Sequence, residues 1–366
     1  MAVCLLGMGI VRAAGQSTVT FDAPGANTKY SSVCASAFGG FLGCGTLALA
    51  NNDRGEVVGT YTGAGFAQHG FLRTPDGHIA TIDAPGAGTG KGQGTAAFSI
   101  NDGGVIAGGF QDSTGLYHAF LRYPSGQFQI FEAPGAGTGP QQGTLATNVN
   151  ASGETAGTFI DSSGTNHGFV GWPESGLVPF DPDGSVYTYP CEETCLSPDG
   201  TVVGFYADGT TGTAHGFVRW AEGYIATIDA PGAATGPNGG TIAASINPAG
   251  EITGYSVDSN NVAHGFLRFP GGRIIPYDDP AASLASGNGT APFCINGSGA
   301  IAGVYWDSSG FGHGFERAAG RSPDNFVVTI QGTAQYTRPS TNNARGEVTG
   351  WYVDSKNVNH GFIWIP

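Results

Sequence analysis

Basic residues are scarce in this sequence. Three lysines and eleven arginines oppose 28 acidic residues, which leaves a net charge of -14 on 366 residues. A negative field of this size disfavours nucleic acid and anionic membrane surfaces as partners. Cationic ligands, metal ions and neutral sugars stay open.

Long apolar runs are also absent. After residue 15 no segment approaches about 18 consecutive apolar residues, so we expect no membrane span. Residues 1–15, MAVCLLGMGIVRAAG, hold a short apolar run followed by small residues, as in a signal peptide. The basic residues that usually precede such a run are missing, which indicates a misassigned start codon or no signal. We expect residues 1–15 to be a signal peptide, complete or truncated, and the protein to be exported to the cell envelope or the exterior.

Sustained helical periodicity is missing as well, so helix should be nearly absent. The 64 glycines and 21 prolines predict many turns, while a hydrophobic content of 40% is too high for a disordered chain. The sequence therefore predicts a folded, turn-rich, all-β protein.

A repeat of about 49 residues spans the chain. Its most constant part is "HGF" or "HAF", which occurs seven times, at His69, His118, His167, His215, His264, His313 and His360. Each copy has four short runs rich in β-branched and aromatic residues, here called strands a to d. In the fifth copy these are residues 241–247, 251–258, 263–269 and 273–280. We predict one domain, 16–366, that is a seven-bladed β-propeller with four antiparallel strands per blade.

The chain ends support this topology. The sequence stops after a strand c, "HGFIWIP", whereas "TVTFDAPGA" at residues 18–26 matches the strand d segment "ATIDAPGA" at 80–87. We therefore expect the N-terminal strand to complete the last blade and close the ring. The "HGF" frame, preceded by "IN..G.I.G" and "D..G", resembles the HAF repeat of extracellular bacterial proteins. That resemblance implies an exported bacterial protein and no particular activity.

The repeated histidines favour a structural role, because a catalytic histidine is normally unique. An acid lies before six of them and another closes strand d in six copies, so we expect each histidine to meet one or two carboxylates. The acids are Asp112, Asp161, Asp208, Asp258, Asp307 and Asp354 in the first set, and Asp22, Asp83, Glu132, Asp181, Asp229 and Asp278 in the second. The alternative is a rim of metal sites with three ligands each. We expect no metal and no cofactor.

Departures from the repeat are the better candidates for function. The first is an insertion, "NTKYSSVCASAFGGFLGCG" at 27–45, which carries Tyr30 and a predicted Cys34–Cys44 disulfide. It is either a ligand-binding loop or a plug. A Cys191–Cys195 bridge stays open, because four extended residues span roughly 13 Å and a disulfide needs about 7 Å.

The second and third departures are in blades 4 and 7. Six strands a begin with threonine, but blade 4 reads "YTYPCEETCLS", which places Cys191 at the threonine position and Glu192 and Glu193 after it. Blade 7 has Arg338 at the position of Glu192. The two blades face each other across the ring, so these residues could meet at the channel mouth, with tyrosines around them. The tyrosines are Tyr30, Tyr187, Tyr189 and Tyr336. The alternative is an irregular exposed blade edge.

The leading functional hypothesis is a monomeric, non-catalytic binding or scaffold protein. Its ligand would be an extracellular glycan or another cell-surface component. The alternative is a polysaccharide lyase or glycoside hydrolase that uses Glu192 and Glu193, with a tyrosine or Arg338, at the mouth near blades 4 and 7. Acid and base chemistry on a glycosidic bond needs two carboxylates at a suitable separation, which a sequence does not provide.

Overall fold

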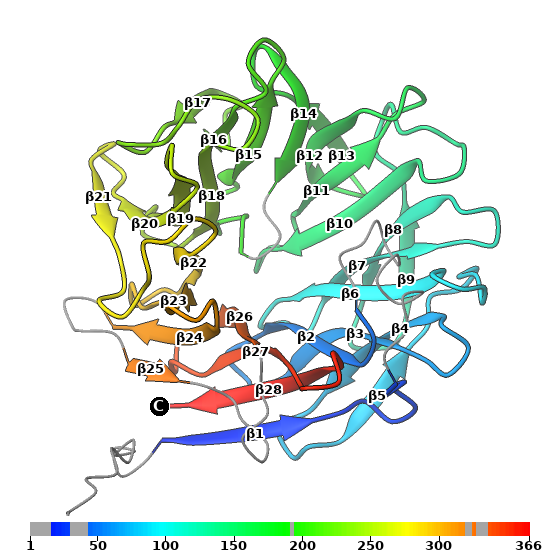
Figure 1. Cartoon of the computed structure of the whole chain (residues 1–366). Coiled ribbons are helices and arrows are strands. Elements are labelled where there is room, and N and C mark those ends of the chain that lie inside the picture. The colour runs from blue at the N-terminus through cyan, green and yellow to red at the C-terminus, as the bar shows by residue number, and fades with distance from the viewer. Residues whose placement is uncertain (1–15, 30–42, 191–193, 319–323, 327–335) are drawn as a thin grey trace, which may run out of the picture.

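We describe a computed structural model of the chain that covers residues 16–29, 43–190, 194–318, 324–326 and 336–366. These residues form β-strands joined by turns, and no helix occurs among them. The strands surround a central axis, as Figure 1 shows. In the described part of the chain no helix could span a membrane.

The strands pair as consecutive antiparallel four-stranded units. Unit 1 is β2 (Thr46–Asn51), β3 (Val57–Thr62), β4 (Gln68–Arg73) and β5 (Ile79–Ile82). Unit 2 is β6 (Gly94–Ile100), β7 (Ile106–Gln111), β8 (Tyr117–Arg122) and β9 (Phe128–Phe131). Unit 3 is β10 (Gly143–Val149), β11 (Thr155–Ile160), β12 (Asn166–Trp172) and β13 (Gly176–Phe180). Unit 4 is β14 (Ser185–Pro190), β15 (Val202–Asp208), β16 (Ala214–Arg219) and β17 (Ile225–Ile228). Unit 5 is β18 (Gly240–Ile246), β19 (Ile252–Val257), β20 (Ala263–Arg268) and β21 (Ile274–Tyr277). Unit 6 is β22 (Gly289–Ile295), β23 (Ile301–Trp306), β24 (Gly312–Arg317) and β25 (Asp324–Phe326).

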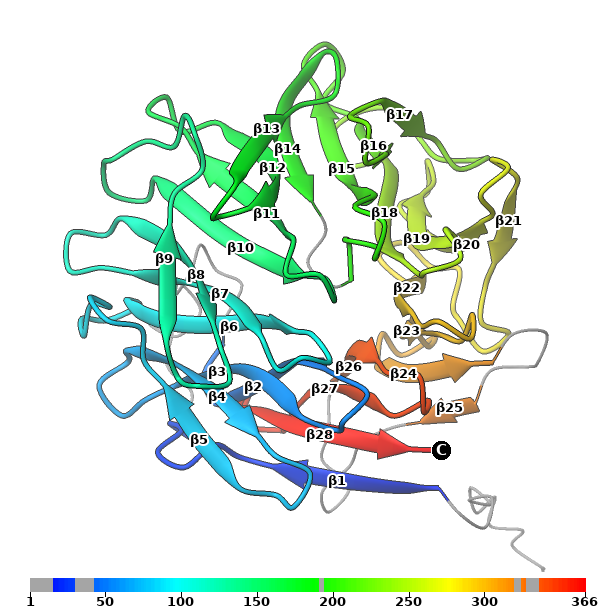
Figure 2. The same cartoon turned by 180° about the vertical axis from the view of Figure 1, so that it is seen from behind.

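Unit 7 combines the two ends of the described chain. It contains β26 (Tyr336–Asn342), β27 (Val348–Val353), β28 (Asn359–Ile365) and β1 (Ser17–Phe21). Strand β1 pairs antiparallel with β28 over its whole length, from Ser17 opposite Ile365 to Phe21 opposite Gly361. This is the pairing predicted from the matching strand d segments, and it is visible from both sides of the molecule (Figures 1 and 2).

Glycine in strand b is required inside each unit. The contact that requires it is with strand a of the same unit. A Cβ on Gly59 would overlap the backbone oxygen of Leu47 and lie 2.9 Å from the Phe71 ring. Strand a carries a bulge at this point, between Ala48 and Ala50, which pushes its backbone toward strand b.

The phenylalanine of each "HGF" joins one unit to the preceding one. Phe120 of unit 2 packs in a cluster with Ile82 and Ala84 of unit 1, and Phe266 of unit 5 packs with Val203 of unit 4. All seven rings are at most 1% exposed. Burial of one such ring contributes about 1.5–3 kcal/mol. The repeated ring therefore forms much of the core between units.

Buried asparagines in the a–b turns also link the units. The side-chain amide of Asn52 donates to the backbone oxygen of Asn101 (3.1 Å), and that of Asn101 donates to the oxygen of Asn150 (2.8 Å). The series continues from Asn150 to Ser197, from Asn247 to Asn296 and from Asn296 to Asn343. Asn343 donates back to the oxygen of Asn52 at 3.1 Å. We call this series the amide ladder. It is interrupted at Ser197, whose hydroxyl bonds Asp199 instead.

We predict that Asn101→Ala destabilises the protein by about 1–3 kcal/mol. The amide of Val105, which donates to Asn101 Oδ1 at 2.9 Å, loses this acceptor, and the oxygen of Asn150 keeps only the bond from the Gly153 amide. Urea unfolding followed by tryptophan fluorescence measures the change, with Ser125→Ala at an exposed turn as control. A change below about 0.5 kcal/mol for Asn101→Ala would show that the ladder contributes little.

Candidate ligand-binding site

The repeated histidines bind carboxylates, as predicted. The Nδ1 atom of six of them lies 2.6–2.9 Å from the acid that follows strand d, and in unit 7 this acid is Asp22, which follows β1. In four units Nε2 lies 3.4–3.6 Å from the acid of the b–c turn, as for His167 and Asp161. In unit 6 the short contact is instead between His313 Nε2 and Asp307, at 2.8 Å.

Most of these imidazoles also stack on a ring of strand b. His69 lies on Tyr61 with centroids 5.1 Å apart, and His118 lies on Phe110 at 4.8 Å. Four of the histidines have carboxylates at both nitrogens, so both hydrogen-bonding positions of these imidazoles are already used. Among the described residues no group of three or more histidines, cysteines and acids could hold a metal ion. The geometry supports a structural role for the histidines.

The surroundings change the pKa of both partners. Burial lowers the pKa of His167, but the carboxylates of Asp181 and Asp161 outweigh it, and the net pKa is raised. The pKa of Asp161 is lowered, mainly by hydrogen bonds from the Ser163 hydroxyl and the Thr165 backbone. Raised values also apply to His69, His264 and His360.

We predict that stability is greatest between about pH 4.5 and 6.5. A histidine whose pKa rises on folding stabilises the protein fully below its unfolded value of about 6.5, and this contribution disappears as pH rises through the folded value. The aspartates, whose pKa falls on folding, stabilise the protein above about pH 4 and lose that effect in acid. Urea midpoints from pH 4 to 9 test this, and His167→Gln should reduce the decline above pH 7. A midpoint that rises from pH 6 to 8 would contradict the prediction.

The structure corrects the alignment of unit 4. Thr188, and not Cys191, occupies the threonine position, because it pairs with Tyr206 as Thr337 pairs with Tyr352. Tyr189 is therefore the residue equivalent to Arg338. The sequence comparison placed the threonine position three residues late, since it did not detect extra residues at the bulge of strand a.

Those extra residues contain the two predicted carboxylates. The backbone amide of Val203 donates a hydrogen bond to the oxygen of Cys195, and Cys294 pairs with Ala302 at the same place in unit 6. In the sequence, the residues between Pro190 and Cys195 therefore stand where the other units have a single bulge residue. Glu192, Glu193 and Cys191 lie outside the described residues, as do Tyr30 and Cys34. The predicted Cys34–Cys44 disulfide therefore also falls outside them. Cys195 is a free, fully buried thiol, so it does not form the bridge left open above.

Arg338 and Tyr336 do come together, in a cluster of rings at the inner strands of units 6 and 7. The guanidinium carbon of Arg338 lies 4.4 Å from the centre of the Phe293 ring and 5.9 Å from that of Trp351. Tyr336 lies between Trp351 (5.5 Å) and Trp306 (6.4 Å). All five side chains are partly exposed. We call Phe293, Trp306, Tyr336, Arg338 and Trp351 the aromatic–arginine cluster.

Tyr187 and Tyr189 form a separate cluster in unit 4. Their rings are parallel with centroids 6.0 Å apart, and both contact Phe205. Among the described residues, the ring contacts of these tyrosines are within unit 4 and those of Arg338 are in units 6 and 7. The single pocket expected from the sequence also includes Tyr30, Glu192 and Glu193, which lie outside the described residues, so it stays a prediction.

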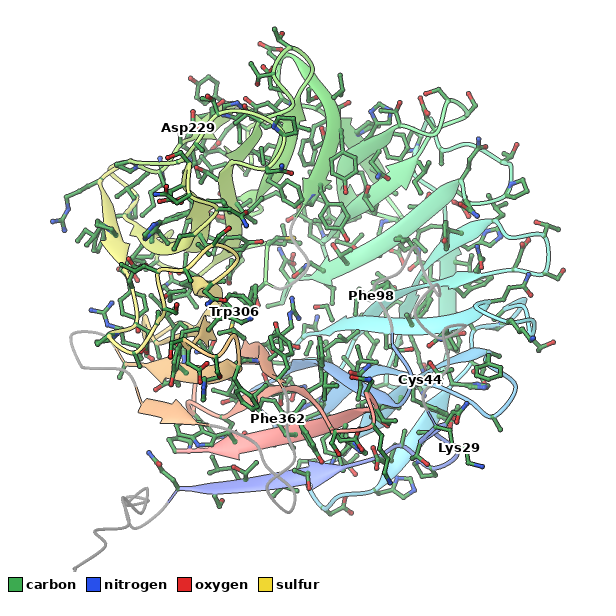
Figure 3. The ribbon with its side chains drawn as sticks, viewed as in Figure 1. Lys29, Cys44, Phe98, Asp229, Trp306 and Phe362 are labelled. Carbon is green, nitrogen blue, oxygen red and sulfur yellow. The ribbon has the colours of Figure 1, made fainter. Side chains whose placement is uncertain are left out.

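Three members of the aromatic–arginine cluster were missed from the sequence. Phe293 occupies the bulge position, where other units have Leu49, Phe98, Thr147, Ala244 or Ser340. Trp306 and Trp351 are on strands b of adjacent units. The signal was their rarity, since the chain has five tryptophans. Figure 3 labels Trp306 and, on the inner strand of unit 2, Phe98.

Comparison with known proteins shows the fold. No protein-family model and no curated sequence matches the chain. The BP39L lectin from Burkholderia pseudomallei matches with a TM-score of 0.55 and 12% identity, over 87% of this chain and 96% of the lectin. The β-propeller domain of the Trilobed protease from Pyrococcus furiosus matches with a TM-score of 0.54 and 9% identity, over 87% and 94%.

A puromycin hydrolase matches with a TM-score of 0.54 and 14% identity over 91% of this chain. The match spans 54% of the hydrolase, so this chain corresponds to about half of that enzyme. These identities are too low to transfer an activity. The all-β chain has a β-propeller fold.

Proposed function

We propose that this protein is an exported binding or scaffold protein, since its resemblance to the HAF repeat implies export, and that its seven units close into a ring of blades. Contacts between units 7 and 1 support closure. Strand β2 contacts β26, β27 and β28, Gly45 forms a parallel bridge with Asn359, and the amide ladder runs from Asn343 to Asn52.

We further propose that the ligand is a carbohydrate and that it binds at the aromatic–arginine cluster. The observation that carries this proposal is the departure at Arg338, where five units have Leu47, Ala96, Leu145, Ile242 or Ala291. A guanidinium held over two rings offers hydrogen-bond donors to hydroxyl groups, and the partly exposed rings offer flat apolar faces. Few directed polar groups on an aromatic surface are typical of small-ligand sites.

The position of the cluster suits this role. Trp306 ends strand b of unit 6, and Tyr336 begins strand a of unit 7, so both lie at the end of the inner strands nearest the b–c turns. The structural contacts of the histidines occupy the outer part of the same end. A ligand at the cluster would therefore meet the inner strands, where the units differ from one another.

We predict that Arg338→Met weakens glycan binding by about tenfold or more, because hydrogen bonds of the guanidinium are lost while the ring contacts of a long side chain are kept. The ligand would be chosen by glycan array and its affinity measured by isothermal titration calorimetry. Arg273→Met is the matched control: Arg273 also lies over a phenylalanine, Phe269, at 4.5 Å, but in an exposed c–d turn.

Equal weakening by both variants would contradict the assigned site. The enzymatic alternative is tested in the same samples by following reducing ends and unsaturated uronate absorbance. Turnover that is lost in Glu192→Gln or Glu193→Gln would replace the binding hypothesis with the lyase or hydrolase.

A further inference from the structure

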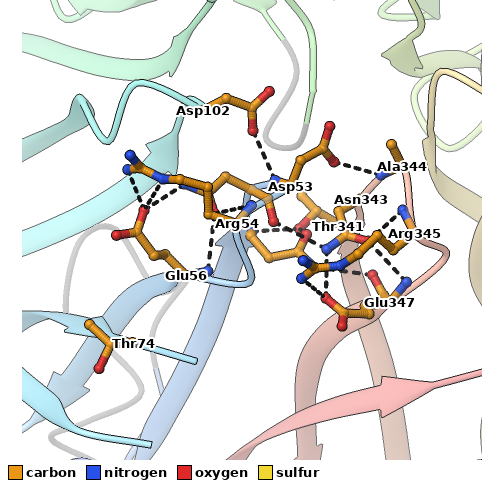
Figure 4. A network of polar contacts seen from close by, with 12 residues as sticks. Asp53, Arg54, Glu56, Thr74, Asp102, Thr341, Asn343, Ala344, Arg345 and Glu347 are labelled. Atoms are coloured by element: carbon orange, nitrogen blue, oxygen red, sulfur yellow. Dashed lines mark hydrogen bonds and ion pairs between the residues drawn. The ribbon is translucent and has the colours of Figure 1, made fainter. Parts of the chain in front are cut away.

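The a–b turns of units 1 and 7 each hold an arginine against a glutamate. The Nη2 atom of Arg54 lies 2.6 Å from Glu56 Oε2, and that of Arg345 lies 2.5 Å from Glu347 Oε2. Both pairs are drawn in Figure 4. Each guanidinium also covers a glycine of the following unit, since a Cβ on Gly55 would lie 2.7 Å from Arg345 Nη2. The groove between two units is therefore a place that receives a guanidinium.

Unit 5 has the same turn without the arginine. The amide of Ala249 donates to Asn247 Oδ1 at 3.1 Å, as the amide of Arg345 donates to Asn343 Oδ1 at 3.0 Å. Glu251 accepts from Asn247 Nδ2 at 2.8 Å and belongs to no ion pair in the described part of the chain. Ala249 thus leaves the carboxylate of Glu251 in place with no cation against it.

A pocket of about 300 Å³ occupies this groove, between units 5 and 6. Glu251 lies on its wall with Ser298 and Gly299 of the next turn, and Leu267, Ile275 and Ile301 provide apolar walls. The corresponding pocket between units 7 and 1, which Arg345 lines, measures about 110 Å³. Of these two pockets, the larger lies at a turn without the arginine.

Two further groups on the wall are relevant to the ligand. The hydroxyl of Tyr277 is buried and has no hydrogen-bond partner. The guanidinium of Arg317 lies 4.3 Å from the centre of the Tyr277 ring. A bound cation can share the pocket with Arg317, because the smaller pocket already holds two arginines. These are Arg73, whose guanidinium carbon lies 5.1 Å from the centre of the Phe21 ring, and Arg345.

We propose that the pocket between units 5 and 6 binds the alkylguanidinium group of another molecule, with its cation on Glu251 and its alkyl chain against Leu267, Ile275 and Ile301. The ligand would occupy the position that Arg54 and Arg345 fill in their own turns. The net charge of -14 adds to the attraction for a cation. This site is separate from the aromatic–arginine cluster and lies at the opposite end of the strands.

The proposal is tested by titrating the full-length protein with agmatine and with the peptide acetyl-Gly-Arg-Gly-amide, using calorimetry at low salt. We expect Glu251→Gln to weaken binding by about tenfold or more. Ala249→Arg should abolish it, because the new side chain repeats the pairing of Arg345 with Glu347 and fills the pocket. Glu222→Gln, which removes an exposed acid from a c–d turn, and Arg338→Met should leave binding unchanged.

The two probes distinguish the source of the group: tighter binding of the peptide indicates an arginine side chain, and equal or tighter binding of agmatine indicates a small molecule. No binding of either probe up to about 20 mM would overturn the proposal. So would equal affinity of the wild type and Ala249→Arg, a variant whose added side chain matches a turn already used twice in this fold.

Discussion

The hydrogen bond from a turn asparagine to the backbone of the next unit is the interaction on which the other features depend. Each such asparagine does two things. In unit 2 the Oδ1 atom of Asn101 accepts a hydrogen bond from the amide of Val105 in its own turn. Its Nδ2 atom donates to the backbone oxygen of Asn150 in the next unit. One side chain therefore joins its own turn to the neighbouring unit, next to the core into which the phenylalanine of strand c packs.

Polar side chains find their hydrogen-bond partners in different places at the two ends of the strands. At the a–b turns the partners belong to adjacent units, so this end holds the assembly together. At the b–c turns the histidine and its carboxylates belong to one unit, so these contacts hold a single meander together. Variation in the second kind of contact has local consequences, which fits the change of partner at His313 without any change in the neighbouring strands.

The sequence predicted most of the fold because the repeat carried it. The strands expected at 241–247, 251–258, 263–269 and 273–280 are found at Gly240–Ile246, Ile252–Val257, Ala263–Arg268 and Ile274–Tyr277. The candidate site was harder to predict, because the repeat of about 49 residues did not reveal that strand a of unit 4 has three extra residues at its bulge. Thr188 shows this: only its pairing with Tyr206 reveals its position. Stacking of Arg338 on Phe293 joins two units, and such contacts leave no pattern in a single sequence.

The pairing of β1 with β28 also bears on the order in which the protein is made. Residues 17–21 leave the ribosome among the first of this sequence, but their partner, residues 361–365, is synthesised almost last. Strand β1 has no partner at this edge until β28 has been made. A product truncated before β28 would retain an exposed strand that chaperones or proteases can recognise.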